Sequence, residues 1–391
     1  MSEHSQKYHV VVIGAGSTGA AVAHDLALRG FKVTVLERGE IASGTTGRNH
    51  CLLHSGGRYC VKDQESAVEC IEENMILRKI MPEAMELNGG LFVAVNDEDM
   101  AYKQSFIEGC EATGIPYKEL NASEARRREP YLSEKTLGAV WVPDGVFEPM
   151  RMCMSFLASA KQNGAMVRPY VEVTGLQVED QRVVAVEVWD RISGEESVIH
   201  ADLVVNAAGP WAGMITDMAG VDVPVVATPG VMVSMTGRYC QLVVNRLNVS
   251  SDGDIVVPQR ETSIIGTSSW TVEDADYIEM PEDHIQMMYD RGSEMMPILR
   301  EVEPRGIFAV ARPLIGRIGE DEREIARTFK CFDHADRDGV EGFVTIAGGK
   351  TTTARAMAEG TVDVVCAKLD LEIPCATKET QLLSYRAYYT I

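Results

Sequence analysis

The chain has 391 residues, of which 45% are hydrophobic and 24% charged, a globular composition that excludes disordered and collagen-like chains. Its 37 basic and 58 acidic residues give a formal net charge of −21 at pH 7, which disfavours binding to nucleic acid and to anionic lipid surfaces. No run reaches the ~20 apolar residues that cross a bilayer, and the first residues lack a signal-peptide cleavage site, so we expect a cytoplasmic protein without direct membrane insertion.

The nine cysteines are widely scattered, form no CxxC pair and have no histidine at zinc-binding spacing. This pattern predicts unpaired thiols in a reducing compartment and no metal site. The sequence shows no internal repeat and no low-complexity linker, so domain boundaries must be inferred from the order of the predicted elements.

The first predicted element is a buried strand over residues 10–13, a continuous apolar run. A GxGxxG motif follows, made by Gly14, Gly16 and Gly19. These glycines allow a tight turn, close approach of the main chain to a pyrophosphate, and close packing of a helix on a strand. The next helix is predicted to end at Gly30, and its N-terminus would face the phosphates.

A second β-rich run, FKVTVLE, ends at Glu37, which follows Gly14 by 23 positions. A carboxylate near this spacing binds ribose hydroxyls, so strand, helix, strand and acid together predict dinucleotide binding. An NAD-binding protein would continue as a regular βαβ unit, whereas residues 38–59 form a long loop rich in glycine and hydroxyl side chains. Such a loop can run along the pyrophosphate towards the ring of a bound cofactor, which favours FAD.

Later elements alternate between two patterns. Residues 60–210 are predicted to contain helices over 66–86 and 151–162, and strands over 89–95, 171–180, 183–190 and 197–209. The runs between 224 and 315 alternate as in an antiparallel sheet, with one helix around 281–298. Residues 342–369 return to strand, glycine pair and helix, which we expect at the isoalloxazine end of the same FAD.

Several segments carry a family resemblance: the loop GTTGRNHCLLHSGGRY, the following DQESAVECIEEN, and the later VVNAAGPWA, ARPL and GFVTIAGGK. Together they resemble the FAD-dependent glycerol-3-phosphate dehydrogenases, particularly the anaerobic-type catalytic subunit, within the D-amino-acid-oxidase-like flavoproteins. The resemblance covers residues 8–376. It implies an α/β and α+β fold, in which an antiparallel-sheet substrate domain is inserted into a discontinuous, Rossmann-like FAD-binding domain. We place the FAD-binding domain at 1–95, 150–225 and 316–391, and the substrate domain at 96–149 and 226–315.

The resemblance also implies the residues that bind the cofactor. The ADP half would lie on Gly14, Ala15, Gly16, Ser17, Thr18, Gly19, Glu37 and Arg38. The loop beside the pyrophosphate and ring would contribute Thr45, Thr46, Arg48, Asn49 and His54. Later contacts would come from Val173 near adenine, from Ala208 and Gly209 near the pyrophosphate, and from Gly349, Lys350 and Thr351 near the flavin pyrimidine.

Four of the candidate residues would carry chemistry. Arg58 and Arg312 match positions expected to hold the anionic group of the substrate, and a structural ion pair is the alternative for each. Lys350 would contact flavin or substrate, against the alternative of a surface lysine. His54 is the first candidate for the proton acceptor, and a hydrogen-bonded structural histidine is equally consistent with its position. Three further histidines are weaker candidates: His50, His284 and His334.

The resemblance implies oxidation of a small anionic secondary alcohol, with sn-glycerol 3-phosphate as the first candidate and hydride transfer to flavin N5. The sequence departs from the family on the substrate side, at Pro229, Met232 and Ala354, and it ends at Ile391 without the cysteine-rich iron–sulfur region of anaerobic members. A related polyol phosphate, 2-hydroxy acid or amino acid therefore remains an alternative substrate. A flavin-binding subunit of a membrane-associated redox complex is another alternative function.

The electron acceptor could be a quinone, an electron-transfer subunit or oxygen, and the oligomeric state stays open. Since no metal relay is encoded in the sequence, electrons would leave to such an acceptor. Any contact with the inner membrane would be peripheral and would come through a partner, because the acidic chain is repelled by anionic lipid.

Overall fold

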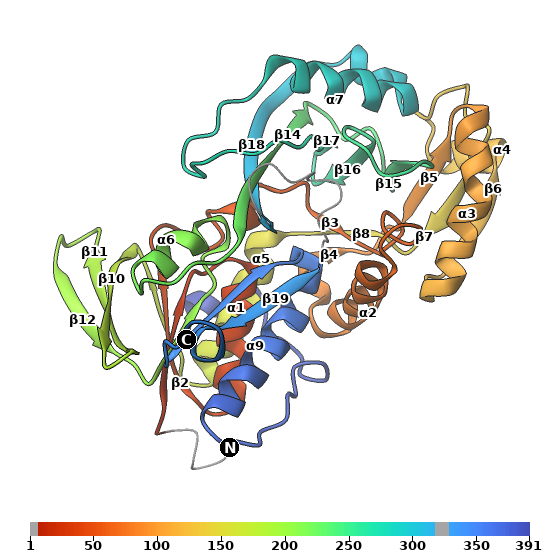
Figure 1. Ribbon diagram of the computed structural model, residues 1–391. Coiled ribbons are helices and arrows are strands. Elements are labelled where there is room, and N and C mark those ends of the chain that lie inside the picture. The colour runs from red at the N-terminus through yellow and green to blue at the C-terminus, as the bar shows by residue number, and fades with distance from the viewer. Residues whose placement is uncertain (1–6, 317–327) are drawn as a thin grey trace.

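The GxGxxG segment lies in a six-stranded sheet of the protein, which is described by a computed structural model over residues 7–316 and 328–391 (Figure 1). The strands, in order across the sheet, are β19 (Phe329–Asp333), β20 (Phe343–Gly348), β13 (Leu203–Asn206), β1 (His9–Ile13), β2 (Lys32–Glu37) and β9 (Met166–Pro169). All neighbours are parallel except β19, which is antiparallel to β20. The apolar run over residues 10–13 is buried in this sheet, as the sequence predicts.

Helix α1 (Ser17–Leu28) is enclosed between this sheet and two further helices, α5 (Pro149–Gln162) and α9 (Ala354–Lys368). Its alanine side chains are buried, and their small size lets the neighbouring helices approach closely. The helix ends just before Gly30, which has the positive φ of +90° that glycine adopts without strain. The β1–α1–β2 unit therefore forms where the sequence predicts it.

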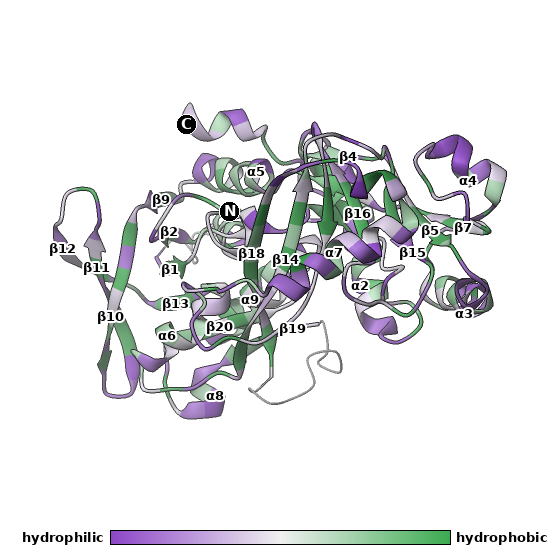
Figure 2. Ribbon diagram, turned by 90° about the horizontal axis from the view of Figure 1, so that it is seen from above, coloured by the Kyte–Doolittle hydropathy of each residue, from purple (hydrophilic) through white to green (hydrophobic). Residues whose placement is uncertain are grey.

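A second sheet of eight strands stands beside the first (Figure 1). Its strands, in order, are β18 (Pro304–Ile315), β14 (Val225–Met235), β17 (Thr262–Gly266), β16 (Ile255–Gln259), β15 (Val243–Arg246), β5 (Gly90–Ala94), β7 (Gly138–Val142) and β6 (Lys118–Asn121). Neighbours are antiparallel apart from β15 and β5, which are parallel. Helix α7 (Glu282–Met295) packs Met288 and Met295 on this sheet, whose strands are largely hydrophobic (Figure 2).

Strand β5 lies in a different sheet from the one that the expected domain boundaries imply. We expected the FAD-binding part to run to residue 95, but β5 pairs with β7 and β15 in the eight-stranded sheet. Its run GLFVA is buried on both faces, and such a run fits the core of either sheet, so periodicity could not assign it. Residues 1–6 and 317–327 of the expected FAD-binding segments lie outside the described residues, and the division into two domains stays a prediction.

Two small sheets and five further α-helices lie in the described residues, together with short 3-10 helices at Thr45–Arg48, Pro82–Ala84, Gly209–Trp211, Pro297–Arg300, Thr351–Thr353 and Tyr385–Tyr389. The small sheets are formed by β10 (Val171–Glu179), β11 (Arg182–Asp190) and β12 (Glu196–His200), and by β3 (Leu52–Leu53), β8 (Gly145–Phe147) and β4 (Met85–Glu86). The helices are α2 (Gln64–Ile80), α3 (Asp97–Thr113), α4 (Ala122–Arg128), α6 (Ala212–Asp217) and α8 (His334–Asp338). Within residues 7–316 and 328–391, no helix has the length and apolarity needed to span a membrane.

Candidate active site

A cavity of about 1460 Å³ opens where the carboxyl ends of β1 and β2 meet the eight-stranded sheet. Ordinary ligand pockets occupy ~300–1000 Å³, so this one has room for a dinucleotide together with a small substrate. Among the predicted site residues, those that line it are Gly14, Gly16, Ser17, Thr18, Glu37, Arg38, Thr45, Thr46, Arg48, Asn49, His54, Arg58, Val173, Ala208, Gly209, Arg312, Gly349, Lys350 and Thr351. Segments far apart in the sequence therefore converge on one cavity.

Two predicted residues, Ala15 and Gly19, lie behind the cavity wall. A Cβ at Gly19 would stand 2.0 Å from the carbonyl oxygen of Gly14, so only glycine permits α1 to approach β1 this closely. Gly14 itself has φ +104°, and a Cβ there would lie 2.7 Å from the carbonyl oxygen of Ala207. The glycines thus have the packing roles that the motif requires.

The N-terminus of α1 faces the cavity between Gly16 and Thr46. Gly16 has no side chain to fill the space, and a Cβ there would come within 3.1 Å of Thr46 Oγ1. The first turn of the helix contains no acidic residue, and the Ser17 N–H donates to Thr46 Oγ1 at 3.0 Å. A helix N-terminus of this kind attracts anions, so this end of the cavity fits a pyrophosphate.

The carboxylate of Glu37 is fixed at the end of β2. Its Oε2 accepts the Ala15 N–H at 2.9 Å, and its Oε1 accepts the Gly39 N–H at 2.8 Å. Each carboxylate oxygen retains a further acceptor site, which suits the hydroxyls of a ribose. Together with the glycine cradle, this donor and acceptor set fits FAD.

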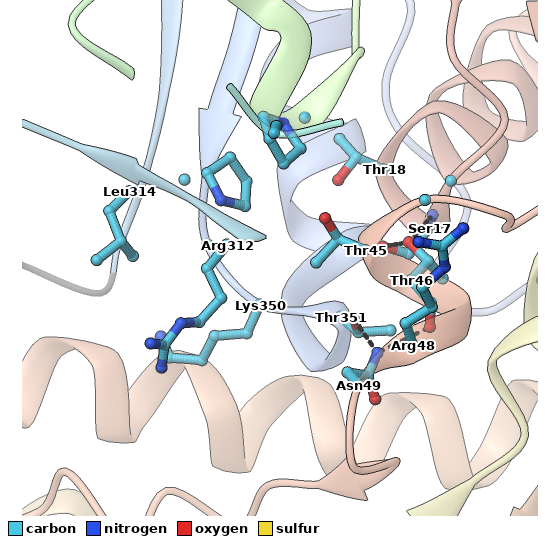
Figure 3. A pocket seen from close by; sticks show the side chains of 18 of the residues that line it. Ser17, Thr18, Thr45, Thr46, Arg48, Asn49, Arg312, Leu314, Lys350 and Thr351 are labelled. Carbon is cyan, nitrogen blue, oxygen red and sulfur yellow. Dashed lines mark hydrogen bonds between the residues drawn. The ribbon is translucent and has the colours of Figure 1, made fainter. Parts of the chain in front are cut away.

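Side chains that carry positive charge gather at another end of the cavity. Arg312 and Lys350 extend in the same direction, away from Ser17 and Thr18 (Figure 3). The Nζ of Lys350 lies 4.9 Å from the centre of the Tyr59 ring, a cation–π contact. This end of the cavity is therefore suited to an anionic substrate.

Arg312, on β18, donates hydrogen bonds to several main-chain carbonyls and to a serine hydroxyl. Its Nε donates to the Thr228 carbonyl at 3.2 Å, and one terminal nitrogen donates to the carbonyls of Pro229 at 3.1 Å and Ser268 at 3.0 Å. The same nitrogen donates to Ser269 Oγ at 2.9 Å. These contacts hold the plane of the guanidinium at the cavity wall.

Arg58 shows features of both roles that the sequence left open for it, a substrate contact and a structural ion pair. It lines the cavity, and it also forms an ion pair with Asp254 at 2.7 Å, in which the two side chains are 14% and 1% exposed. A second nitrogen donates to Asn245 Oδ1 at 3.3 Å. Although burial opposes its charge, Asp254 raises the pKa of Arg58, which stays cationic.

Two neutral histidines lie beside these cations. Burial above all, together with the neighbouring cations Lys350 and Arg58, holds the pKa of His54 well below its usual value. Burial, with smaller contributions from Arg58 and Arg312, lowers the pKa of His50 to about 3. The two rings lie 6.1 Å apart, and the lowered pKa values keep both imidazoles in the neutral form at neutral pH.

The other two candidate histidines do not line the cavity. His284 contacts Ser268 Oγ at 3.1 Å, and His334 is buried against Asp338 and Thr345. Within residues 7–316 and 328–391, no group of three or more histidine, cysteine, aspartate or glutamate side chains is arranged to hold a metal.

Sequence reasoning did not predict many residues that line the cavity, among them Tyr59, Trp211 and Asp276. Tyr59 directly follows Arg58, and Trp211 follows the small residues after β13, so both lay next to recognised motifs. Asp276 forms a two-point ion pair with Arg38, at 2.5 and 3.1 Å, and Arg38 also stacks on Trp211 at 4.3 Å. No local signal predicts Asp276, since 238 positions separate it from Arg38.

Comparisons with known proteins agree with this geometry. The model of the FAD dependent oxidoreductase family matches residues 9–356. The chain is 45% identical over 387 residues to an anaerobic glycerol-3-phosphate dehydrogenase subunit of Haloferax volcanii, covering 95% of this chain and 66% of that protein. It is 39% identical over 381 residues to the corresponding subunit of Escherichia coli, covering 97% and 70%. The chain therefore spans about two thirds of the length of these relatives.

A solved structure extends the comparison. The glycerol-3-phosphate dehydrogenase from Bacillus halodurans, complexed with FAD, superposes with a TM-score of 0.74 at 26% identity, covering 97% of this chain and 68% of that one. The predicted fold class, the family resemblance and the FAD cofactor are thereby confirmed, while the roles of the individual site residues stay predictions. The chain belongs to the FAD dependent oxidoreductase family.

Proposed function

We propose that the protein oxidises the secondary hydroxyl of a small anionic alcohol, with sn-glycerol 3-phosphate as the substrate and dihydroxyacetone phosphate as the product. The observation that carries this proposal is the convergence of Arg312 and Lys350 on one end of the cavity, apart from the α1 N-terminus (Figure 3). Relatives named glycerol-3-phosphate dehydrogenases support the choice of substrate.

The chain's own residues would bind and orient the substrate. Arg312 presents a guanidinium held in one plane by carbonyls, and a planar fork matches the oxygens of a phosphate. Lys350 adds a second positive charge at the same end. Fixing the anion in this way orients the carbon that bears the hydroxyl, and such orientation contributes several kcal/mol to a rate enhancement.

Removal of the hydroxyl proton requires a base, and His54 and His50 are the candidates. Both line the cavity and both are neutral at pH 7, since their pKa values lie below the usual range. FAD, when bound, supplies the acceptor for the hydride. Gly14, Gly16, Glu37 and Thr46 would hold it.

A direct test mixes the FAD-bound protein anaerobically with a panel of glycerol 3-phosphate, other polyol phosphates, 2-hydroxy acids and amino acids, and follows loss of flavin absorbance. We expect glycerol 3-phosphate to reduce the flavin fastest. Arg312→Lys should retain FAD but raise the substrate concentration for half-maximal reduction by roughly 10- to 100-fold, because charge-assisted hydrogen bonds to one anion are lost.

A matched control is Arg300→Lys, because Arg300 pairs with Asp290 at the surface and does not line the cavity. This variant should behave as the unmodified protein. If another class of substrate reduces the flavin while glycerol 3-phosphate does not, the assigned substrate is wrong. If Arg312→Lys leaves the half-maximal concentration unchanged, the anion site lies elsewhere.

The relatives' designation as subunits supports a partner protein as the route by which electrons leave, to a quinone or an electron-transfer subunit. Peripheral contact with the inner membrane would then come through that partner in a cytoplasmic protein. Reduced protein mixed with air or with a soluble quinone separates these acceptors: fast reoxidation by air would identify an oxidase instead.

A further inference from the structure

The position of Arg58 depends on two separate parts of the fold. Its main chain belongs to the loop after β3, whereas its guanidinium contacts Asn245 on β15 and Asp254 just before β16. The loop has turn hydrogen bonds of its own, such as those from the Tyr59 and Cys60 N–H groups to the Gly56 carbonyl. These bonds lie within the loop and do not join it to strand β15.

Asp144 connects these two parts. It lies in the turn between β7 and β8 and is 2% exposed. One carboxylate oxygen accepts the main-chain N–H of Ser55, three residues before Arg58, at 2.8 Å. The other oxygen accepts from the side-chain nitrogen of Asn245 at 3.2 Å. A single buried carboxylate thus bonds both the loop that carries Arg58 and the amide that receives it.

Asp144 determines which groups donate and which accept in these hydrogen bonds. Both of its oxygens accept N–H donors, which is the pattern of an ionised carboxylate. The amide nitrogen of Asn245 must therefore face Asp144, and its oxygen must face Arg58. A reversed amide would direct its N–H groups at a cation and leave buried donors without acceptors, which is costly.

The chain makes room for this carboxylate at Gly90. A Cβ there would stand 2.6 Å from Asp144 Oδ2 and 2.8 Å from its Cβ. Gly90 lies on β5, which pairs with β15. The absence of a side chain at this position leaves space for Asp144 beside both strands. Asp144 does not line the cavity itself.

We propose that Asp144 is a positioning residue for the substrate site, which sets the direction of the Arg58 guanidinium through Asn245 and Ser55. The inference rests on the proposed function, because it assigns Arg58 to the substrate end of the cavity. Since Asp254 already compensates the charge of Arg58, Arg58 acts mainly through the direction of its guanidinium.

Exchange of the two side chains tests the proposal. Asp144→Asn alone offers one acceptor to two N–H donors, and Asn245→Asp alone sets a second carboxylate against Asp144. In the double variant Asp144→Asn/Asn245→Asp, the amide at 144 can accept from Ser55 and donate to the carboxylate at 245, which still accepts from Arg58. The exchange restores the polarity of all three bonds and leaves the net charge unchanged.

We expect each single variant to slow flavin reduction at saturating substrate by roughly 10- to 100-fold, the cost of misplacing a contact by about 1 Å, and the double variant to recover most of the rate. The substrate concentration for half-maximal reduction should change less than in Arg312→Lys. Urea unfolding of the FAD-bound proteins gives a readout that needs no substrate, and the double variant should be more stable than the sum of the single effects implies.

Asp25→Asn is the matched control, because Asp25 is an equally buried aspartate paired with Arg29 on α1, away from the cavity. It should lose stability without slowing flavin reduction. Single variants as fast as the unmodified protein, or a double variant that does not recover rate or does not fold, would overturn the inference. If no alcohol reduces the flavin of the unmodified protein, the proposed function fails instead, and the unfolding cycle alone decides whether Asp144 and Asn245 are coupled.

Discussion

The orientation of a buried polar side chain in this protein depends on its hydrogen-bond and ion-pair partners. Arg58 and Arg312 illustrate the contrast, since the first is held by a buried carboxylate and the second by carbonyls. Sequence reasoning could place both at the cavity, because each adjoins a recognisable motif. It could not distinguish their partners, because Asp254 and Thr228 lie 196 and 84 positions away.

His24 offers a test at this scale. It is 1% exposed on α1, and neither ring nitrogen has a hydrogen-bond partner among the described residues. Burial lowers its pKa from 6.5 to about 4. Between these values the unfolded chain binds a proton that the folded chain does not, so the free energy of unfolding should fall as the pH falls from 6.5 to 4.

His24→Leu should remove this part of the pH dependence, which amounts to roughly 3 kcal/mol over the whole interval. Urea unfolding of the FAD-bound protein, repeated across that pH range, measures the difference between the two proteins. Other buried histidines contribute the same pH dependence to the variant and to the unmodified protein, so they do not affect the difference. Equal pH slopes for the variant and the unmodified protein would show that His24 binds its proton equally in the folded and unfolded chains, which contradicts the lowered pKa.

Among the elements, the junction of β1 and α1 was the most predictable, because all its determinants lie within a few residues. Three glycines, an apolar run and the acid at the end of β2 act locally, so their pattern is visible in the sequence. Strand β5 was predicted as a strand, but the sheet that it joins could not be predicted, because its partners β7 and β15 lie far along the chain. Local pattern predicts an element, whereas its sheet depends on distant partners.

Substitution at this junction should affect the cofactor first. In Gly19→Ala the new methyl group would stand 2.0 Å from the Gly14 carbonyl oxygen, which forces α1 away from β1 and disrupts the pyrophosphate cradle. We expect purified protein with little flavin absorbance. Gly213→Ala on α6 is the control, since the new methyl group would have no atom within 4 Å and flavin content should be unchanged.

Helices α2 and α9 are joined by a buried ion pair, which gives a second test at this scale. Arg355 donates two hydrogen bonds from Nε and one from a terminal nitrogen to Glu73, and both side chains are almost fully buried. Glu73→Gln should lower the free energy of unfolding by about 1–3 kcal/mol, because the buried arginine loses its hydrogen bonds to an ionised carboxylate while Glu359, at 2.7 Å, remains as a charged partner. The double variant Glu73→Leu/Arg355→Met should lower the free energy of unfolding by less than Glu73→Gln does. A larger decrease for the double variant in urea unfolding would contradict this reasoning.

At the scale of the whole molecule, an ion pair between two residues that line the cavity joins segments next to different sheets. Arg38 follows β2 of the six-stranded sheet, and Asp276 lies between β17 and α7 of the other part. Both side chains are partly exposed, at 34% and 49%, so the pair contributes about 1 kcal/mol or less and is weakened by salt. Because both residues line the cavity, the pair links the two parts of the fold at the cofactor site.

Asp276→Asn should therefore speed the release of FAD several-fold at low ionic strength, with little change in the overall free energy of unfolding. The recovery of flavin fluorescence after dilution measures this rate. At high salt the unmodified protein should approach the variant. Asp290→Asn, which removes the surface pair with Arg300, should leave release unchanged, and an equal effect of both substitutions would assign the change to net charge.

The order of strands in the six-stranded sheet has a consequence for biosynthesis. The ribosome delivers β1 and β2 first, but β1 pairs on its other side with β13, and β13 in turn with β20, which ends at Gly348. Until those segments emerge, the apolar edge of β1 stays open and attracts other strands. A nascent chain of this protein thus passes most of its synthesis with an incomplete cofactor cradle, and capture of FAD comes as a late event that closes the fold.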